Sequence, residues 1–291
     1  MNGRDMRGRP YALVIGDPVA HSKSPLIHRF WLEECGIDAE YGIETVAEGK
    51  VAAFLARHRD NPAWRGANVT MPHKQAILPL LDRLDPLAKR IGAVNTVVRE
   101  SDGTLVGYNT DAGGFLEPLR PLLARPHLFR MARIVGTGGA ARAVVAALAD
   151  EGFTLVLIGR DPAKARAILD ELAPDGEHHT APLSHFAEPT DFVFDDREGI
   201  LDLVVNASPL GMDGQPPLVL NRSHIPPGSV LYDIVTVPRE TSFLKTGRAD
   251  GAVCFDGVDM LLGQAVEAFA RFFEQPPLRA RDGDLRQKLY A

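Results

Sequence analysis

The sequence predicts an α/β protein with two domains, and three features of the chain indicate this. Short apolar segments of strand character alternate with helical segments, which is typical of parallel sheets joined by crossover helices. A glycine-rich turn near the middle of the chain lies between an apolar strand and an apolar helix. Pro118, Pro121 and Pro126 interrupt the pattern shortly after Leu116, so we place a domain boundary there.

Length and composition are those of a folded protein. The chain has 291 residues, enough for two ordinary domains, and is 45% hydrophobic and 24% charged. A net charge of -6 gives no general attraction to nucleic acid or to a membrane surface, so local groups must hold any anionic ligand. The basic start of the chain leads into neither a signal core nor an apolar run of about 18 residues, so we expect a cytoplasmic protein. Cys35 and Cys254 lack metal-ligand spacing, which predicts neither a disulfide nor a metal site.

In the N-terminal part, apolar runs bounded by glycine, proline or polar residues predict strands, and amphipathic runs predict helices. The expected strands are at 11–15, 41–46 and 66–70, and the expected helices at 24–34 and 50–58. A helical pattern at 73–84, interrupted near Pro79, is followed by a strand at 91–98 and a short strand after Gly103.

Polar side chains gather where the third of these strands ends. Asn68 and Thr70 supply an amide and a hydroxyl, and Lys74 supplies an ammonium group just after Pro72, at what reads as a helix start. A cation in the first helical turn faces the positive end of the macrodipole, which is locally unfavourable. An exposed lysine on an ordinary helix is the simpler alternative. The combination of the three groups suggests a bound ligand.

Two serines lie at the start of the first predicted helix. Ser24 before Pro25 is a ready N-cap with proline at the first helical position. Capping does not explain Ser22, and paired hydroxyls beside a helix N-terminus also suit a carboxylate. From these residues alone, capping and anion binding are both open.

Three further polar side chains stand in apolar surroundings. Asn95 interrupts a strand, and a buried amide must be hydrogen-bonded, so it is satisfied either by backbone or by a ligand. Asp111 follows a strand end, where capping of the next helix is the usual role. Gln264, taken alone, is explained as part of a helix surface.

The second half begins with a strand at 132–135, the glycine-rich turn and a helix at 143–149. This is the GxGxxG/A pattern in the strand-turn-helix context of a Rossmann-like, doubly wound domain. Gly136 would allow the tight turn, Gly138 the approach of a pyrophosphate to backbone N–H groups, and Ala141 close helix packing. A glycine-rich loop without a ligand is the alternative. The residues expected to bind a dinucleotide are Gly136, Thr137, Gly138, Gly139, Ala140 and Ala141.

The end of the next strand, at 155–158, bears on the choice of cofactor. Arg160 at this position suits a 2'-phosphate, and Lys164 lies one turn into the following helix, so NADP is expected. Asp161 before Pro162 is explained as an N-cap, although an adjacent carboxylate also suits NAD. Strands at 201–205, 230–235 and 251–255 and a helix from Gly257 to about Phe273 complete the chain.

Between about Tyr11 and Arg271 the chain resembles the shikimate dehydrogenase family in seven motifs that occur in the family's order. They are His21-Ser-Lys-Ser-Pro25, Asn68-Val-Thr-Met-Pro-His-Lys74, Ala93-Val-Asn-Thr96, Asn109-Thr-Asp111, the turn 136–141, Asn206-Ala-Ser-Pro-Leu-Gly-Met212 and Met260-Leu-Leu-Gly-Gln264. One such motif is easily matched by chance, whereas seven in order are not.

The resemblance implies a fold and an activity. It implies a substrate domain at 1–116, completed by helices at 258–291, and an NADP-binding Rossmann-like domain at 117–257, with the substrate in a cleft between them. The implied reaction is the reversible, NADPH-dependent reduction of 3-dehydroshikimate to shikimate, in aromatic amino-acid and chorismate biosynthesis.

Carried over to the matching positions, the resemblance also implies roles for single residues. Lys74 and Asp111 would form the catalytic pair. The residues that would hold the shikimate carboxylate are Ser22, Ser24 and Tyr232. Those that would bind the ring hydroxyls are Asn68, Thr70, Asn95, Asp111 and Gln264. The turn 136–141 would hold the pyrophosphate, Arg160 and Lys164 the 2'-phosphate, and Gly257 would contact the nicotinamide.

The chain departs from the family pattern at two positions. Thr236 stands where the family often has a tyrosine, and Gly159 replaces a common asparagine before the arginine. Alternatives to a shikimate dehydrogenase are a quinate/shikimate dehydrogenase that uses NAD and a sensor that binds NADP or shikimate without turnover. The protein is expected to be a monomer or a homodimer, and no single helix or patch reads as a dimer face that would decide between the two.

Overall fold

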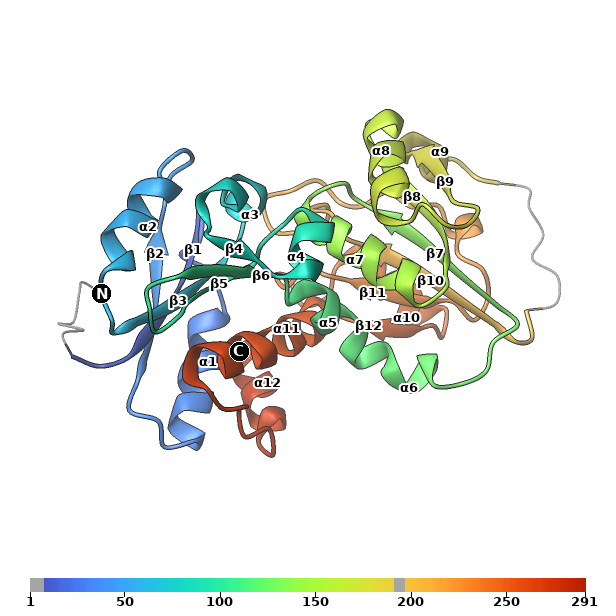
Figure 1. Cartoon of the computed structure of the whole chain (residues 1–291). Coiled ribbons are helices and arrows are strands. Elements are labelled where there is room, and N and C mark those ends of the chain that lie inside the picture. Colours follow the sequence, from blue (N-terminus) through green and yellow to red (C-terminus); the bar gives the residue numbers. More distant parts are fainter. Residues whose placement is uncertain (1–7, 191–196) are drawn as a thin grey trace. The chain divides into compact units, whose positions relative to one another are not determined.

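The computed structural model describes residues 8–190 and 197–291 and shows an α/β protein, as the sequence predicts. The chain divides into two compact units, coloured along the sequence in Figure 1. The first unit ends at Thr110 and is completed by Leu262–Ala291, and the second unit is Asp111–Leu261. Helix α11 (Gly257–Phe273) begins in the second unit and ends in the first.

The first unit is built on a six-stranded sheet with the order β2-β1-β3-β5-β6-β4. Its strands are β1 (Tyr11–Gly16), β2 (Glu40–Thr45), β3 (Trp64–Val69), β4 (Arg83–Leu84), β5 (Thr96–Arg99) and β6 (Leu105–Tyr108). Its other elements are α1 (Ser24–Glu34), α2 (Val51–Arg59), α3 (His73–Ala76), η1 (Leu78–Leu80), α4 (Pro86–Ile91), part of α11, and α12 (Asp282–Tyr290).

The sheet of the first unit is mixed. β1 pairs in parallel with β2 and β3, but β5 pairs antiparallel with both β3 and β6. The expected parallel pairing is therefore confirmed for β1 with β2 and β3 and for β4 with β6, and is wrong for β5. The reason is a hairpin between β5 and β6, whose turn is closed by the Glu100 and Thr104 backbone and by the Asp102 carboxylate, which accepts from the Thr104 N–H.

The predicted helix at 73–84 and strand at 91–98 are also wrong in their bounds. The helix ends after one turn at Ala76, and a 3-10 turn and the edge strand β4 follow, because Pro79 has no N–H to continue the helical ladder. Ile91 ends α4, which Asp85 caps through the Leu87 N–H and Gly92 terminates in the left-handed conformation. β5 consequently starts only at Thr96.

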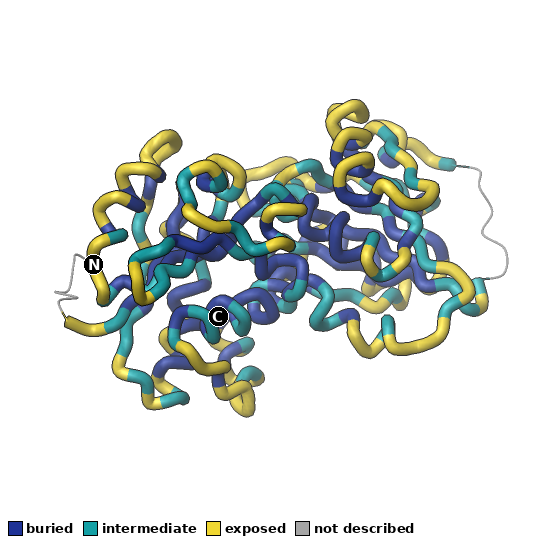
Figure 2. The backbone as a smooth tube through the Cα atoms, viewed as in Figure 1, coloured by how far each residue is buried: buried dark blue, intermediate teal, exposed yellow. Residues whose placement is uncertain are grey.

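The core of the first unit is formed by apolar side chains of its sheet and of α2. The buried stretches follow the strands in Figure 2, while the outer side of α2 is exposed. Leu13, Phe54, Trp64 and Val97 are among the buried side chains of this cluster. Because strands β1, β3 and β5 are fixed by this packing, the polar residues at their ends have fixed positions.

The second unit is built on a six-stranded parallel sheet with the order β12-β11-β10-β7-β8-β9. Its strands are β7 (Phe129–Val135), β8 (Thr154–Gly159), β9 (His179–Pro182), β10 (Ile200–Asn206), β11 (Val230–Asp233) and β12 (Val253–Phe255). Its helices include α5 (Asp111–Leu116), η2 (Glu117–Leu119), α6 (Arg120–Leu123), α7 (Gly139–Asp150), α8 (Pro162–Leu172), α9 (Leu183–Ala187), η3 (Arg222–His224) and α10 (Ser242–Ala249).

The strand order of the second unit reverses at β7, with β8 and β9 on one side and β10 to β12 on the other. In open parallel sheets, ligands bind at the carboxyl ends of the strands beside such a reversal. The predicted doubly wound, Rossmann-like arrangement is therefore confirmed, and the glycine-rich turn follows β7 at the reversal.

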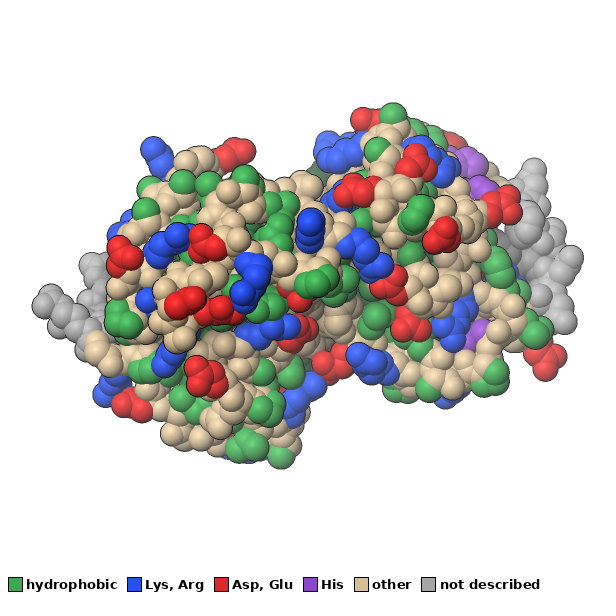
Figure 3. Space-filling model, viewed as in Figure 1, with side chains coloured by type: hydrophobic (Ala, Val, Ile, Leu, Met, Phe, Trp, Pro, Cys, Tyr) green, Lys and Arg blue, Asp and Glu red, His purple; other side chains and the backbone are tan. Residues whose placement is uncertain are grey.

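Charged groups on the visible surface are mixed. Figure 3 shows acidic and basic side chains interspersed on this face, consistent with the small net charge of -6. Across residues 8–190 and 197–291, none of the helices combines the length and hydropathy that a bilayer span requires.

His28 lies fully buried on α1 in an aromatic cluster of the first unit. Its ring stacks on that of Tyr41, with centroids 4.0 Å apart and planes 1° apart, and lies 5.9 Å from that of Phe269. Neither ring nitrogen has a hydrogen-bond partner within the described chain. Burial lowers the pKa of His28 from its usual 6.5 to about 3, because a charged imidazole would be desolvated there.

This burial predicts a loss of stability in mild acid. Below a pH of about 6.5 the unfolded chain binds a proton at His28 that the folded chain does not bind until about pH 3, so the free energy of unfolding should fall as pH drops through that window. At roughly 1.4 kcal/mol per pH unit, the loss from this group is about 2 kcal/mol between pH 7.5 and 5. His28→Phe should remove that part of the pH dependence in urea unfolding.

Phe269→Leu, a change in the same cluster without a titrating group, should lower stability by a similar amount at both pH values. A wild-type protein and a His28→Phe variant with the same pH dependence would contradict the assignment.

Candidate functional site

Six buried side chains form a polar network in the first unit, near the end of β3 and the start of β5. They are Tyr41, Asn68, Asn95, Thr96, Thr110 and Gln264. β3 and β5 run antiparallel with Asn68 opposite Thr96, so the two strands bring the amides together. Buried amides and hydroxyls are stable only when hydrogen-bonded, and the network meets this need inside the sheet.

Asn68 is held from two sides. Its Oδ1 accepts a hydrogen bond from the Tyr41 hydroxyl at 2.5 Å, and its Nδ2 donates to Thr96 Oγ1 at 3.1 Å and to the Asn95 carbonyl at 3.4 Å. Asn68 thus sits in a fixed rotamer at the end of β3.

Asn95 links β5 to the segments around Thr110 and Gln264. Its Oδ1 accepts from the Thr110 N–H at 2.8 Å and from the Thr96 hydroxyl at 3.1 Å. Its Nδ2 donates to Thr110 Oγ1 at 2.9 Å, and Gln264 Oε1 lies 3.5 Å away. The sequence left two partners open for the Asn95 amide, the backbone or a ligand. The Thr110 backbone N–H is one of its partners, and side chains of the network are the others.

Ser22 and Ser24 lie at the start of α1, but the capping expectation for Ser24 is wrong. The helix begins at Ser24 itself, Lys23 is its N-cap, and no side chain caps the helix. The reason is that Pro25 occupies the second helical position, so Ser24 is already inside the first turn. Ser22 Oγ accepts from the Ser24 N–H at 3.3 Å, which orients the Ser22 hydroxyl at the helix start.

Thr70 and Lys74 follow β3 on the same connection. The Thr70 N–H donates to the Ile15 carbonyl, and the Lys74 carbonyl accepts from the Val94 N–H at 2.8 Å, so both backbones are anchored to neighbouring segments. The sequence predicts that the macrodipole of the helix disfavours the charge of Lys74. This effect is small here, because α3 has only four residues and few aligned peptides. The neighbouring His73 is buried and its Nε2 donates to the Val46 carbonyl at 2.6 Å, which gives it a structural role.

In the second unit, the glycine-rich turn joins β7 to α7. Gly136 has φ of +127°, and a Cβ there would lie 2.5 Å from the Ala207 carbonyl oxygen, so only glycine fits. Gly138 precedes α7, is exposed, and a Cβ there would meet nothing within 4 Å. The first N–H groups of a twelve-residue helix thus face open space, which suits a phosphate group. The other residues of the turn are Thr137, Gly139, Ala140 and the fully buried Ala141.

The end of β8 presents two cations and one committed carboxylate. Arg160 and Lys164 are exposed, and the guanidinium of Arg160 makes no ion pair within the described chain. Asp161 caps α8, and its Oδ1 accepts from the N–H groups of Ala163 at 2.9 Å and Lys164 at 3.2 Å, so the N-cap expectation is confirmed. One oxygen of the adjacent carboxylate is therefore engaged by the start of α8, and the exposed side chains of Arg160 and Lys164 bring positive charge to the same strand end.

The remaining predicted residues also belong to the second unit. Asp111 is the buried first residue of α5, and Gly257 starts α11 against the backbone of Ile234 and Val235. Tyr232 on β11 is fully buried, and its ring stacks on that of Phe115 with centroids 4.7 Å apart. Thr236 is half-buried in the loop after β11.

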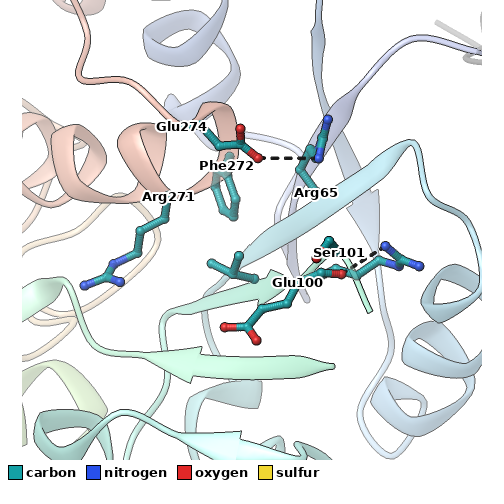
Figure 4. Close-up of a pocket in the computed structure, with 8 residues that line it drawn as sticks. Arg65, Glu100, Ser101, Arg271, Phe272 and Glu274 are labelled. Atoms are coloured by element: carbon teal, nitrogen blue, oxygen red, sulfur yellow. Dashed lines mark hydrogen bonds and ion pairs between the residues drawn. The ribbon is translucent and has the colours of Figure 1, made fainter. Parts of the chain in front are cut away.

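A cavity of about 310 Å³ in the first unit is lined by none of the predicted site residues. Figure 4 shows Arg65, Arg271 and Glu100 at its walls, with Arg65 turned toward Glu274. Arg271 pairs with Glu267 and covers the Tyr108 ring instead of pointing into the cavity. Because the charged groups are engaged with the protein, this cavity does not resemble a ligand site.

Sequence reasoning missed three members of the polar network. Tyr41 was predicted only as the start of a strand, and Thr96 and Thr110 only as members of two motifs, yet all three contact the predicted amides. A fully buried tyrosine needs a hydrogen-bond partner, and Tyr41 is the one buried residue of β2, so a tyrosine among the polar residues of 40–45 was the available signal.

Comparisons with known proteins identify a family for the first unit and relatives for the whole chain. Residues 14–97 match the family model described as the shikimate dehydrogenase substrate binding domain. A protein named shikimate dehydrogenase (NADP(+)) from Sphingopyxis alaskensis is 44% identical over 283 residues, which are 97% of each chain. The chain belongs to the shikimate dehydrogenase family.

Solved structures of this family have the same fold. The shikimate 5-dehydrogenase of Thermus thermophilus, in complex with NADP(H) and shikimate, matches with a TM-score of 0.81 and 32% identity, covering 96% of this chain and 99% of that one. A quinate dehydrogenase from Corynebacterium glutamicum in complex with NAD matches with a TM-score of 0.80 and 29% identity, covering 96% and 99%. Both cofactors thus occur among structures of this fold, and the residues after β8 bear on the choice for this family member.

The two glycines of the turn should respond differently to a methyl group. Gly136→Ala should lower the free energy of unfolding by more than about 1 kcal/mol, because the new Cβ meets the Ala207 carbonyl and φ is positive. Gly138→Ala should change it by less than about 0.5 kcal/mol, because nothing is in its way. Urea unfolding of both variants followed by circular dichroism measures this, and equal losses would show that the turn is built differently.

Proposed function

We propose that this protein is a shikimate dehydrogenase that catalyses the reversible, NADPH-dependent reduction of 3-dehydroshikimate to shikimate. The observation that carries the proposal is the 44% identity to a shikimate dehydrogenase (NADP(+)) across 97% of both chains, which includes both units. The polar network of the first unit and the glycine-rich turn of the second supply chemistry that suits a polyhydroxylated acid and a dinucleotide.

The proposed substrate has one carboxylate and several hydroxyl groups, and both units offer matching groups. We assign the carboxylate to the hydroxyls of Ser22, Ser24 and Tyr232, since a helix start with paired serines suits an anion. The ring hydroxyls are assigned to Asn68, Thr70, Asn95, Asp111 and Gln264. Amides that are already fixed by the protein lose little entropy when they bind a ligand, which favours recognition.

The proposed cofactor is NADP, and the residues after β7 and β8 fit it. The turn 136–141 leaves open space at the start of α7 for the pyrophosphate. Arg160 and Lys164 supply positive charge for a 2'-phosphate, while Asp161 uses its Oδ1 to cap α8. Gly257 is assigned to the nicotinamide side. A quinate dehydrogenase that uses NAD would be expected to offer a carboxylate to the ribose 2'-hydroxyl at this strand end in place of the positive charge.

In the proposed mechanism, the bound nicotinamide supplies the hydride and the protein handles the proton. Lys74 donates a proton to the developing alkoxide at C3 in the direction of reduction and accepts it in the direction of oxidation. Asp111 is proposed to hold the amine in position. If a water molecule relays the proton instead, Lys74 still orients the substrate, and the loss of rate on its removal would be smaller.

The test is a steady-state assay of shikimate oxidation at 340 nm with NADP, and of the same reaction with quinate and with NAD. The wild type should use shikimate and NADP best. Lys74→Met should lower kcat by about 10²- to 10⁴-fold with KM for shikimate within a few-fold, because general acid-base catalysis contributes that much.

Lys89→Met, an exposed lysine on α4 of the same unit, is the matched control and should leave both constants unchanged. Normal kcat in Lys74→Met would remove Lys74 from the mechanism. Absence of turnover in the wild type with each substrate and cofactor would instead favour a binding protein.

Cofactor choice predicts a second result. Arg160→Ala should raise KM for NADP by about 10- to 100-fold, since a charge-assisted hydrogen bond to the phosphate contributes about 1.5–3 kcal/mol, and should leave KM for NAD within about twofold. Arg166→Ala, exposed on α8, serves as the control for loss of positive charge on the same helix. Parallel increases of both KM values would show that Arg160 does not read the 2'-phosphate.

We also propose that the protein acts in the cytoplasm as a monomer or homodimer. Light scattering distinguishes the 31.6 kDa chain from its dimer.

A further inference from the structure

We propose that Tyr41 is a positioning residue that fixes the side-chain amide of Asn68, so that Asn68 offers the substrate one hydrogen-bond acceptor and no donor. This inference rests on the proposed function, in which Asn68 binds a ring hydroxyl of shikimate. It adds to that function a residue outside the family motifs and a direction for one hydrogen bond.

The orientation of the Asn68 amide follows from its neighbours. The Asn95 carbonyl, 3.4 Å away, can only accept, so the nitrogen of Asn68 must face it. Thr96 gives its one hydroxyl proton to Asn95 Oδ1, so its oxygen is free to accept from the same nitrogen at 3.1 Å. The oxygen of Asn68 is therefore the atom that faces Tyr41 and accepts its hydroxyl proton at 2.5 Å.

Most of the hydrogen-bonding groups of the Asn68 amide are already used within the protein. Its two N–H groups are used by Thr96 and by the Asn95 carbonyl, and one of the two lone pairs on Oδ1 is used by Tyr41. The remaining capacity of Asn68 is one lone pair. A substrate hydroxyl that meets Asn68 must donate its proton there and accept from another group.

Tyr41 is built to stay in this role. It is fully buried, its carbonyl accepts from Arg29 Nε at 2.7 Å, and its ring is stacked on His28 with parallel planes. In the sheet, β1 separates Tyr41 from Asn68 and carries the small Ala12 opposite Tyr41, which leaves room for the ring across β1. Burial raises the pKa of Tyr41 well above its usual value, so the phenol keeps the proton that it donates.

The experiment compares two tyrosine-to-phenylalanine variants in the same sheet. Tyr41→Phe removes only the hydroxyl that anchors Asn68, and it should raise KM for shikimate about tenfold while kcat changes less than about threefold and KM for NADP stays unchanged. Tyr11→Phe is the matched control. Tyr11 is buried on β1, and its hydroxyl bonds His58 Nδ1 at 3.0 Å and Asn61 Nδ2 at 3.1 Å, away from Asn68, so its loss should leave KM for shikimate unchanged.

Binding is measured in parallel by calorimetric titration of shikimate without cofactor, where Tyr41→Phe should weaken affinity about tenfold. If Tyr41→Phe does not fold, Thr96→Val removes the second anchor of the same amide and should raise KM for shikimate in the same selective way.

The outcomes separate the inference from the proposed function. An active wild type with a selective effect of Tyr41→Phe supports the inference. An active wild type with no effect of Tyr41→Phe, or with equal effects of Tyr41→Phe and Tyr11→Phe, overturns the inference and leaves the function standing. A wild type that neither turns over nor binds shikimate overturns the proposed function and this inference with it.

Discussion

The first unit depends on one constraint, which is that amides buried at the ends of strands must be hydrogen-bonded. Asn68 and Asn95 lie where apolar strands end, and each would cost about 1–3 kcal/mol if left unpaired. The fold meets this cost with Tyr41, Thr96 and Thr110, so that each amide is held from more than one side. The same bonds that allow burial also fix where the remaining polar atoms point. Stability and recognition thus rest on one set of contacts.

Much of the second unit was predictable from local pattern. The second halves of β7, β8 and β10 are largely buried and give apolar runs, and the turn after β7 has the spacing that a phosphate-binding turn needs. The edge strand β9 lies in a polar stretch and was not predicted. Asp161 before Pro162 marked the start of α8 correctly, because capping is a local interaction. Such features involve residues close in sequence, which a single sequence displays.

The first unit was less predictable, because long-range pairing decided its details. The hairpin of β5 and β6 made the sheet mixed, and Pro79 turned a predicted helix into one turn and an edge strand. Of the candidate site, residue types and motifs identified the amides and serines. They did not identify Tyr41, which is 27 residues from Asn68 and meets it only because β1 lies between their strands. Contacts of this kind depend on the order of the strands in the sheet, and the hydrophobic periodicity of the sequence does not predict that order.

The cap of α8 has a consequence for efforts to redesign the cofactor preference. In the proposed cofactor site, Asp161 is the natural carboxylate to recruit for a ribose hydroxyl, but it is already bonded to two N–H groups of the helix start. Turning it outward would remove a cap that typically contributes about 1 kcal/mol. An engineer who wants an NAD-using variant must therefore recruit Asp161 through Oδ2 with the cap in place, supply a new carboxylate elsewhere, or replace the lost anchor of α8 at the same time.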